Sequence, residues 1–210
     1  MAQVIDITDI DVVFISYDEP QAEKNWLLLK RIAPWAQRVH GVKGSDAAHK
    51  AAAQLSTTDR VITIDGDNIV DPEFFDNMLV LTNENKDHTF SWRARNAVNG
   101  LYYGNGGIKC WPVQFIMDMK THEASDGSDP SSIVEFCWEG KYTQMFNCYS
   151  TTHCNGSPYQ AWRAGYREGV KLPLKRGLKP DRASFMSDVH RRNLELLRIW
   201  QTIGADAQNG

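Results

Sequence analysis

The sequence predicts a single α/β domain built on a doubly wound, mostly parallel sheet. Three apolar runs typical of buried strands alternate with two helical patterns between residues 1 and 65. This order favours parallel strands joined by right-handed crossovers. The length of 210 residues and the hydrophobic content of 42% are those of one globular domain. Ligands of such sheets bind beyond the carboxyl ends of the strands, so functional side chains are expected there.

The first predicted strand is DVVFIS, residues 11–16, which ends in the polar turn YDEP. Pro20 suits the first turn of a helix, because its fixed φ angle matches helical geometry and the turn needs no donor there. Trp26, Leu29 and Ala33 then follow at helical spacing. One apolar face of this helix is therefore expected to pack on the sheet.

A weaker strand is predicted at QRVHGV, residues 37–42, and a second helix follows it. Ser45 is expected to cap this helix. The apolar face of the helix consists of small or aliphatic residues that allow close packing on a sheet, namely Ala47, Ala48, Ala51, Ala52 and Leu55. RVITID, residues 60–65, is the third predicted strand.

Two acids, Asp65 and Asp67, stand at the end of the third strand with Gly66 between them. Like charges this close repel, so a cation is expected to accompany them. Mg²⁺ and Mn²⁺ often take only one or two carboxylates and leave positions for diphosphate oxygens. The alternative is a polar turn in which both acids are solvated and Asp71 caps a helix that begins at Pro72.

Two segments before position 76 share the order of a known pattern, FISYDEP at the first strand end and GSDAAHKAAAQLSTTDRVITIDGDN at residues 44–68. Together they resemble the nucleotide-binding half of GT-A fold glycosyltransferases, especially the family-2-like group. The resemblance implies one GT-A domain over residues 1–210. Residues 1–90 would bind the nucleotide and residues 91–210 the acceptor.

The second half of the chain offers further pieces of this pattern. GNGG, residues 104–107, looks like the glycine loop that lies against the donor sugar and diphosphate in GT-A enzymes. A β-hairpin turn is the alternative. In many GT-A enzymes a later acid acts on the acceptor hydroxyl and a late histidine completes the metal shell, which implies these roles for Glu135 and His153. The alternatives are an outward-facing strand residue and a turn histidine.

The resemblance implies three groups of site residues in addition to the catalytic base Glu135. The cation ligands are expected to be Asp65, Asp67 and His153. The nucleotide-sugar ligands are expected to be Tyr17, Asp18, Lys43, His49, Asp65, Gly106, Gly107 and Arg163. The acceptor ligands are expected to be Trp92, Trp138, Arg167 and Lys171. Core packing is the alternative for the tryptophans, and solvent exposure is the alternative for the basic residues.

The charge of the chain is distributed unevenly, which bears on the acceptor. Residues 1–140 hold 12 Lys and Arg against 21 Asp and Glu, whereas residues 141–210 hold 11 against 5. The basic segment at 162–182 suits phosphates of a nucleotide or a nucleic acid, and a solvated face is the alternative. A small chain with a basic end resembles compact bacteriophage glycosyltransferases, some of which modify hydroxymethylated bases in DNA. DNA is thus the first expected acceptor, and a surface glycan or a protein is the alternative.

The expected activity is metal-dependent transfer of a sugar from a nucleotide diphosphate sugar, first of all a UDP-sugar, to an acceptor hydroxyl. Two rival classes stay open. A sugar-nucleotide nucleotidyltransferase usually carries a glycine-rich basic loop after the first strand, where this chain has SYDEPQAEKN. A non-catalytic DNA-binding module gives no reason for clustered acids at a strand end, and the sequence has no helix-turn-helix or zinc-finger signature.

Location and redox state are predicted from what the sequence lacks. No apolar run approaches the roughly 20 residues of a membrane span, and the N-terminus has no signal-peptide pattern. A cytoplasmic location is therefore expected, that of the host if the chain is encoded by a phage. The four cysteines form no CxxC pair and are expected to be reduced packing residues: Cys110, Cys137, Cys148 and Cys154.

Overall fold

The computed structural model describes residues 2–104, 106–121 and 141–171, and the account of the fold covers these residues. The strands are β1 (Gln3–Asp6), β2 (Asp11–Ser16), β3 (Gln37–His40), β4 (Arg60–Asp65), β5 (Asn68–Val70), β6 (Met78–Leu81), β7 (Thr89–Asn96), β8 (Tyr102–Tyr103), β9 (Ile108–Pro112) and β10 (Tyr142–Thr152). The α-helices are α1 (Ala22–Ile32), α2 (Ser45–Leu55), α3 (Val113–Asp118) and α4 (Pro158–Lys171). Two short 3₁₀ helices, η1 (Ile7–Asp9) and η2 (Pro72–Asp76), follow β1 and β5.

The main sheet has eight strands in the order β3-β2-β4-β9-β7-β10-β5, with β8 paired to β7. The pairs β2–β3, β2–β4 and β7–β10 are parallel. The pairs β4–β9, β7–β9, β7–β8 and β5–β10 are antiparallel. The sheet is therefore mixed: its parallel part contains the three strands expected from the N-terminal sequence pattern, and the second half of the chain adds the antiparallel pairings.

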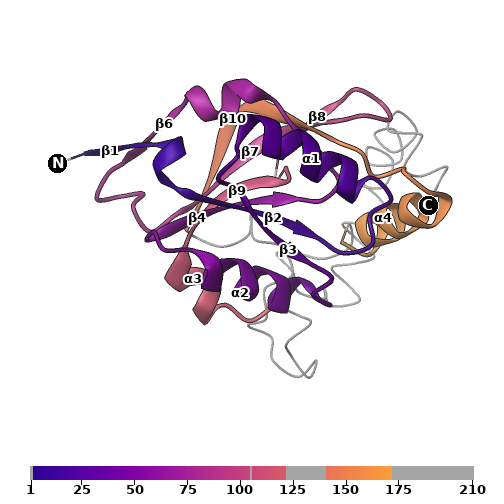
Figure 1. Cartoon of the computed structure of the whole chain (residues 1–210), viewed down its shortest axis with the longest axis horizontal. Helices are drawn as coiled ribbons and strands as arrows, with labels where there is room; N and C mark the ends of the chain where they lie inside the picture. Colours follow the sequence, from indigo (N-terminus) through magenta and orange to yellow (C-terminus); the bar gives the residue numbers. More distant parts are fainter. Residues whose placement is uncertain (1, 105, 122–140, 172–210) are drawn as a thin grey trace, which may run out of the picture.

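Helices cover both faces of the sheet, as the doubly wound prediction requires. Figure 1 shows α1 on one side of β2 and β4, and α2 with α3 on the other. The alternation within β2 explains this arrangement, because successive side chains of a strand point to opposite faces. Val12 and Phe14 join the core under α1, whereas Val13 joins the core under α2 and α3. Both faces of this strand are thus buried.

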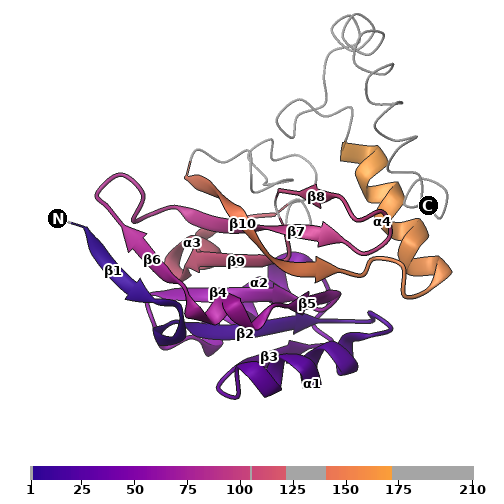
Figure 2. The same cartoon turned by 90° about the horizontal axis from the view of Figure 1, so that it is seen from above.

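The ends of the sheet have different surroundings. The antiparallel ribbon of β1 and β6 lies near one end of the molecule, and α4 lies at the other, beyond the carboxyl ends of β2 and β4 (Figure 2). Helix α4 therefore borders the edge of the sheet at which a ligand is expected.

The elements predicted up to Asp65 are confirmed, with corrections at the starts of α1 and α2. Helix α1 begins at Ala22 after the N-cap Gln21, so Pro20 lies in the preceding turn and not in the first turn of the helix. Ser45 is the first residue of the second helix, α2; the N-cap is Gly44, whose φ of 92° suits glycine. The Ser45 side chain instead lies 3.3 Å from Nδ1 of His49, one turn further along. The prediction thus located the start of α2 correctly, but the capping residue is Gly44 and not Ser45.

No helix among the described residues is long and apolar enough to cross a membrane. Among the described cysteines, Cys110 is buried, and Cys148 and Cys154 are half-buried. Cys137 lies outside the described residues, and the reduced state of the cysteines stays a prediction.

Candidate functional site

The carboxyl ends of the three parallel strands lie side by side. Ile15 of β2 is in register with Asp65 of β4, and Ser16 of β2 is in register with His40 of β3. The turns that follow β2 and β4 therefore share one edge. The loop after β10 reaches the same edge, because the backbone N–H of His153 donates a hydrogen bond to the Asp67 carbonyl over 2.8 Å. Segments far apart in sequence are thus in contact, as expected for loops at this edge.

Three acids gather around the turn at Gly66. A Cβ placed on Gly66 would lie 2.8 Å from Glu19 Oε2, so the Glu19 carboxylate lies directly over this turn. Burial, and then the carboxylates of Asp65 and Glu19, raise the pKa of Asp67 to about 7. None of the ion pairs in the described part of the chain involves Asp65 or Asp67. The turn therefore holds negative charge that the described protein does not neutralise.

The raised pKa of Asp67 predicts that the metal-free protein becomes less stable as the pH rises from about 4 to 7. The folded state binds the Asp67 proton more tightly than the unfolded chain does, so ionisation near pH 7 opposes folding. A rise from 3.8 to about 7 corresponds to at most about 4 kcal/mol. Thermal unfolding in chelator should show that the stability difference between Asp67→Asn and the wild type grows in favour of the variant across this pH range. A difference that does not change with pH would contradict the raised pKa.

The Asp67 carboxylate also receives a hydrogen bond from its neighbour. Asn68 Nδ2 donates to Asp67 Oδ1 over 2.7 Å, and Asn68 Oδ1 accepts from Thr152 Oγ1 over 2.9 Å. Thr152 Oγ1 accepts in turn from the Tyr103 hydroxyl over 2.7 Å. Burial raises the pKa of the Tyr103 hydroxyl, so this group stays a donor at neutral pH. Residues of three strands are therefore linked in a chain that ends on Asp67.

Helix α1 fixes the backbone of the same edge. Buried Asn25 donates through Nδ2 to the Gly66 carbonyl over 3.0 Å. Gln21 Nε2 donates to the His153 carbonyl over 3.1 Å, and the Gln21 side chain fills the space beside Gly156. The beginning of α1 thus ties together the acidic turn and the loop after β10.

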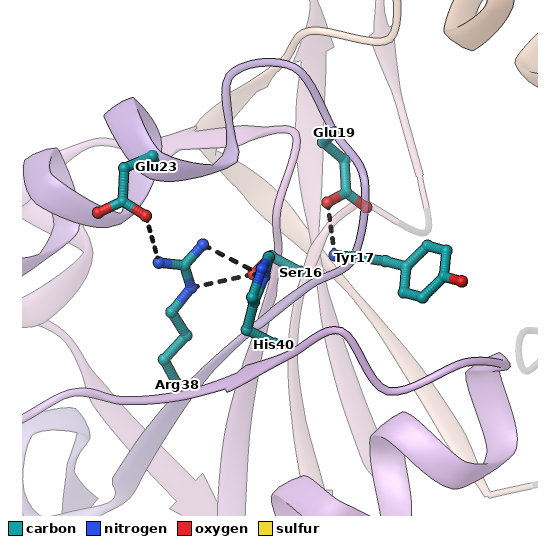
Figure 3. A network of polar contacts seen from close by, with 6 residues as sticks. All are labelled: Ser16, Tyr17, Glu19, Glu23, Arg38 and His40. Atoms are coloured by element: carbon teal, nitrogen blue, oxygen red, sulfur yellow. Dashed lines mark hydrogen bonds and ion pairs between the residues drawn. The ribbon is translucent and has the colours of Figure 1, made fainter.

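A second polar network joins the ends of β2 and β3 to α1 (Figure 3). The Arg38 guanidinium donates to Ser16 Oγ over 3.0 Å and pairs with Glu23 over 2.6 Å. Ser16 Oγ also lies 3.0 Å from Nδ1 of His40. The Tyr17 N–H donates to Glu19 Oε2 over 2.8 Å, and the Tyr17 ring points away from Arg38 (Figure 3). The turn after β2 is thereby held so that Glu19 faces Gly66.

Several residues expected to bind the nucleotide sugar lie at the rim of this edge. Asp18 forms an ion pair with Arg163 of α4, with 3.3 Å between Oδ1 and Nη1, although 145 positions separate them. Both side chains are about half exposed. Tyr17 and Lys43 are exposed in the turns that follow β2 and β3. The structure therefore brings these sequence-predicted residues to one edge, and their ligand contacts stay a prediction.

Other predicted site residues have packing roles that count against direct ligand contact. His49 is buried against Trp111, its Nδ1 lies 2.8 Å from the Ser45 carbonyl oxygen, and burial lowers the pKa of its imidazole. Trp92 is only 3% exposed and meets Phe74 edge-on, with 5.0 Å between ring centroids. The expectation that Trp92 stacks on an acceptor is therefore corrected, because its ring belongs to the core.

The glycines expected to face the donor lie against protein instead. A Cβ on Gly106 would be 2.6 Å from the Trp92 carbonyl oxygen, and one on Gly107 would be 2.1 Å from Asn68 Nδ2. The Gly107 carbonyl accepts from the Asp65 N–H over 2.9 Å. Close packing of the segment just before β9 against its neighbours thus already accounts for both glycines.

The remaining predicted site residues are only partly covered by the structure. Arg167 is exposed on α4, and Lys171 is the last residue of that helix, its side chain lying outside the described part. Glu135 and Trp138 lie outside the described residues. The catalytic role of Glu135 and the acceptor roles of Trp138, Arg167 and Lys171 therefore stay predictions.

The acidic turn fits a divalent cation that shares its ligands with a substrate. Within the described residues, no group of three or more His, Cys, Asp or Glu side chains could hold a metal unaided. Mg²⁺ and Mn²⁺ need only one or two carboxylates when water and phosphate oxygens complete the shell. Asp65 and Asp67 supply this donor set, and their uncompensated charge would be relieved by the ion.

Sequence reasoning missed four residues of this edge: Glu19, Asn68, Tyr103 and Thr152. The position of Glu19 could have been predicted from the sequence, because a residue that follows the first strand must lie at the carboxyl edge of the sheet. The other three become neighbours through the β5–β10 and β7–β8 pairings, which no local pattern indicated.

No protein-family model matches the chain, and no curated protein matches it. A solved structure described as a putative glucose-1-phosphate thymidylyltransferase from Bacillus anthracis, in complex with sucrose, aligns with 80% of this chain and 98% of its own length. Its sequence identity to this chain is 10% and the TM-score is 0.42. A similarity of this extent does not by itself assign an activity.

Proposed function

We propose that the chain is a GT-A-type glycosyltransferase that uses a nucleotide diphosphate sugar and a divalent cation. The observation that carries the proposal is the Asp65-Gly66-Asp67 turn at the carboxyl end of β4, where uncompensated acids face the ligand edge of parallel strands. A diphosphate with its cation is the ligand that matches these charges. A solvated acidic turn would not account for a half-buried Asp67 whose pKa is raised by its surroundings and by two further acids.

The described residues have distinct roles in this proposal. Asp67 and Asp65 would hold the cation. His153 contacts Asp67 through its backbone N–H, but its side chain does not form a three-ligand group with the two acids in the described structure. When bound, the cation would neutralise the charge that develops on the departing diphosphate. Arg163 would exchange its contact with Asp18 for the diphosphate, since both side chains are exposed. Glu135 remains the proposed base for the acceptor hydroxyl in an inverting reaction.

The acceptor is proposed from the charge of the chain. Exposed Arg167 of α4 begins the part of the basic segment that would meet DNA phosphates. Residues 172–182 of this segment lie outside the described residues. DNA with hydroxymethylated bases is therefore the first acceptor to test, and surface glycans and proteins are the next.

A donor-hydrolysis screen tests the proposed function. Several nucleotide diphosphate sugars are incubated with Mn²⁺ or with chelator, and release of the nucleoside diphosphate is measured. We expect hydrolysis of at least one donor with Mn²⁺ and none with chelator, and faster release when hydroxymethylated rather than plain DNA is added. Pyrophosphate release from nucleoside triphosphate and sugar 1-phosphate, without donor hydrolysis, would instead indicate a nucleotidyltransferase. Equal rates of nucleoside diphosphate release with hydroxymethylated and plain DNA would rule out hydroxymethylated DNA as the acceptor.

A further inference from the structure

We propose that Asn68, Thr152 and Tyr103 form a one-directional hydrogen-bond relay that fixes the orientation of Asp67, so that the site selects small octahedral cations over Ca²⁺. The proposal deepens the proposed function and rests on Asp67 as the cation ligand. Asn68, Thr152 and Tyr103 are positioning residues in it, since they act on the cation only through Asp67.

The direction of the relay follows from its members. The Asn68 amide NH₂ faces Asp67 Oδ1. This direction suits the cation-bound form that the proposed function requires, because an ionised carboxylate only accepts hydrogen bonds. The amide oxygen of Asn68 then faces Thr152 and needs a donor, which the Thr152 hydroxyl supplies. The Thr152 oxygen in turn accepts from the Tyr103 hydroxyl. Each donor therefore points toward Asp67, and reversing any one of them would leave two acceptors or two donors face to face.

The surroundings hold the relay in place. Asn68 is 2% exposed and Thr152 is 7% exposed, so water competes little for their polar groups. The two residues are also register partners of β5 and β10. Gly107 leaves the space that the Asn68 amide fills, since a Cβ there would lie 2.1 Å from Asn68 Nδ2. The Asn68 side chain is therefore closely enclosed, and a flipped amide would leave its oxygen facing the ionised Asp67 carboxylate.

A fixed Asp67 carboxylate restricts how a cation is bound. Asn68 occupies Oδ1 over 2.7 Å, which leaves Oδ2 as the carboxylate oxygen that Asn68 does not engage. One-oxygen coordination suits Mg²⁺ and Mn²⁺, which demand near-octahedral geometry at short distances. Ca²⁺ takes more oxygens and often uses both oxygens of a carboxylate. The relay therefore disfavours the larger ion.

The relay itself is tested on the metal-free protein by NMR of the Asn68 side-chain amide, at a pH above the pKa of about 7 at which Asp67 ionises. We expect NH₂ signals that exchange slowly with solvent in the wild type and at least tenfold faster in Thr152→Val, because the valine removes the donor to Asn68. Thr152→Ser should restore slow exchange, since it keeps the hydroxyl. Thr151→Val is the matched control one residue earlier, where the side chain points to the opposite face of β10. Fast exchange in the wild type, or equal effects at positions 151 and 152, would overturn the relay.

The cation preference is tested by calorimetric titration of UDP in Mn²⁺ and in Ca²⁺. We expect the wild type to bind UDP at least tenfold more tightly with Mn²⁺, and Thr152→Val to lower this ratio by about fivefold or more, with recovery in Thr152→Ser. An unchanged ratio in Thr152→Val would overturn the selection role. If the wild type binds UDP with neither ion, the proposed function and the selection role both fail, while the NMR result still decides whether the relay exists.

Discussion

Asp67→Asn is expected to reduce Mn²⁺-dependent UDP binding by at least about 100-fold while leaving the chain folded. The substitution keeps the size of the side chain but removes a proposed cation ligand, whose loss should cost more than that of an outer partner. Calorimetric titration of UDP with saturating Mn²⁺ measures the effect. The protein should not unfold, because removing one of three clustered acids relieves repulsion in the metal-free state.

Asp76→Asn is the matched control for this experiment. Asp76 is an exposed acid at the end of η2, and it carries the same charge outside the acidic turn. Its substitution should leave UDP affinity within about twofold of the wild type. Equal affinities of Asp67→Asn and Asp76→Asn would show that the acidic turn does not bind the cation.

Gly106→Ala is expected to destabilise the protein by about 3 kcal/mol, at the upper end of overpacking effects. The added methyl group would lie 2.6 Å from the Trp92 carbonyl oxygen and 2.8 Å from the Ala94 nitrogen. These are backbone atoms of β7, so the clash cannot be relieved by rotating a side chain. Denaturant unfolding followed by tryptophan fluorescence measures the loss.

Gly169→Ala is the control for the loss of a glycine. A Cβ at Gly169 meets nothing within 4 Å, and alanine favours the helical backbone there. This variant should be neutral or slightly stabilised. If Gly106→Ala had the same free energy of unfolding as Gly169→Ala, residues 106–107 would not lie as close to β7 as the structure shows.

The N-terminal part of the sheet was predictable because its elements depend on local patterns. The short apolar run in residues 11–16 favours a buried strand, and the spacing of Trp26, Leu29 and Ala33 favours a helix. The structure has β2 and α1 there. The cap of α2 was missed because serine and glycine are adjacent, and only the backbone angle of Gly44 distinguishes them. The antiparallel strands of the second half had no such signature.

Only those residues of the candidate site that directly follow a strand could be predicted from the sequence. Asp65 and Asp67 follow a buried strand, so the sheet alone places them at the ligand edge. The contact between His153 and Asp67 agrees with the same rule, although it is made by backbone and leaves the metal role of the imidazole a prediction. The glycines at 106 and 107 show the limit of this reasoning: their lack of a side chain signals a close neighbour, and that neighbour proved to be protein.

The position of β10 between β7 and β5 determines the order in which the molecule can be assembled. The chain up to Asp65 forms β2, β3 and β4 and their helices. The paired residues of these strands are closer in sequence than those of β5 and β10. The acidic turn is different, because its far side is closed only when Asn68–Val70 pairs with Ser150, Thr151 and Thr152, much later in the chain. Contacts of such high sequence separation form slowly during folding. A nascent chain therefore builds the framework of β2, β3 and β4 early and completes the turn around Asp67 only after β10 has been synthesised.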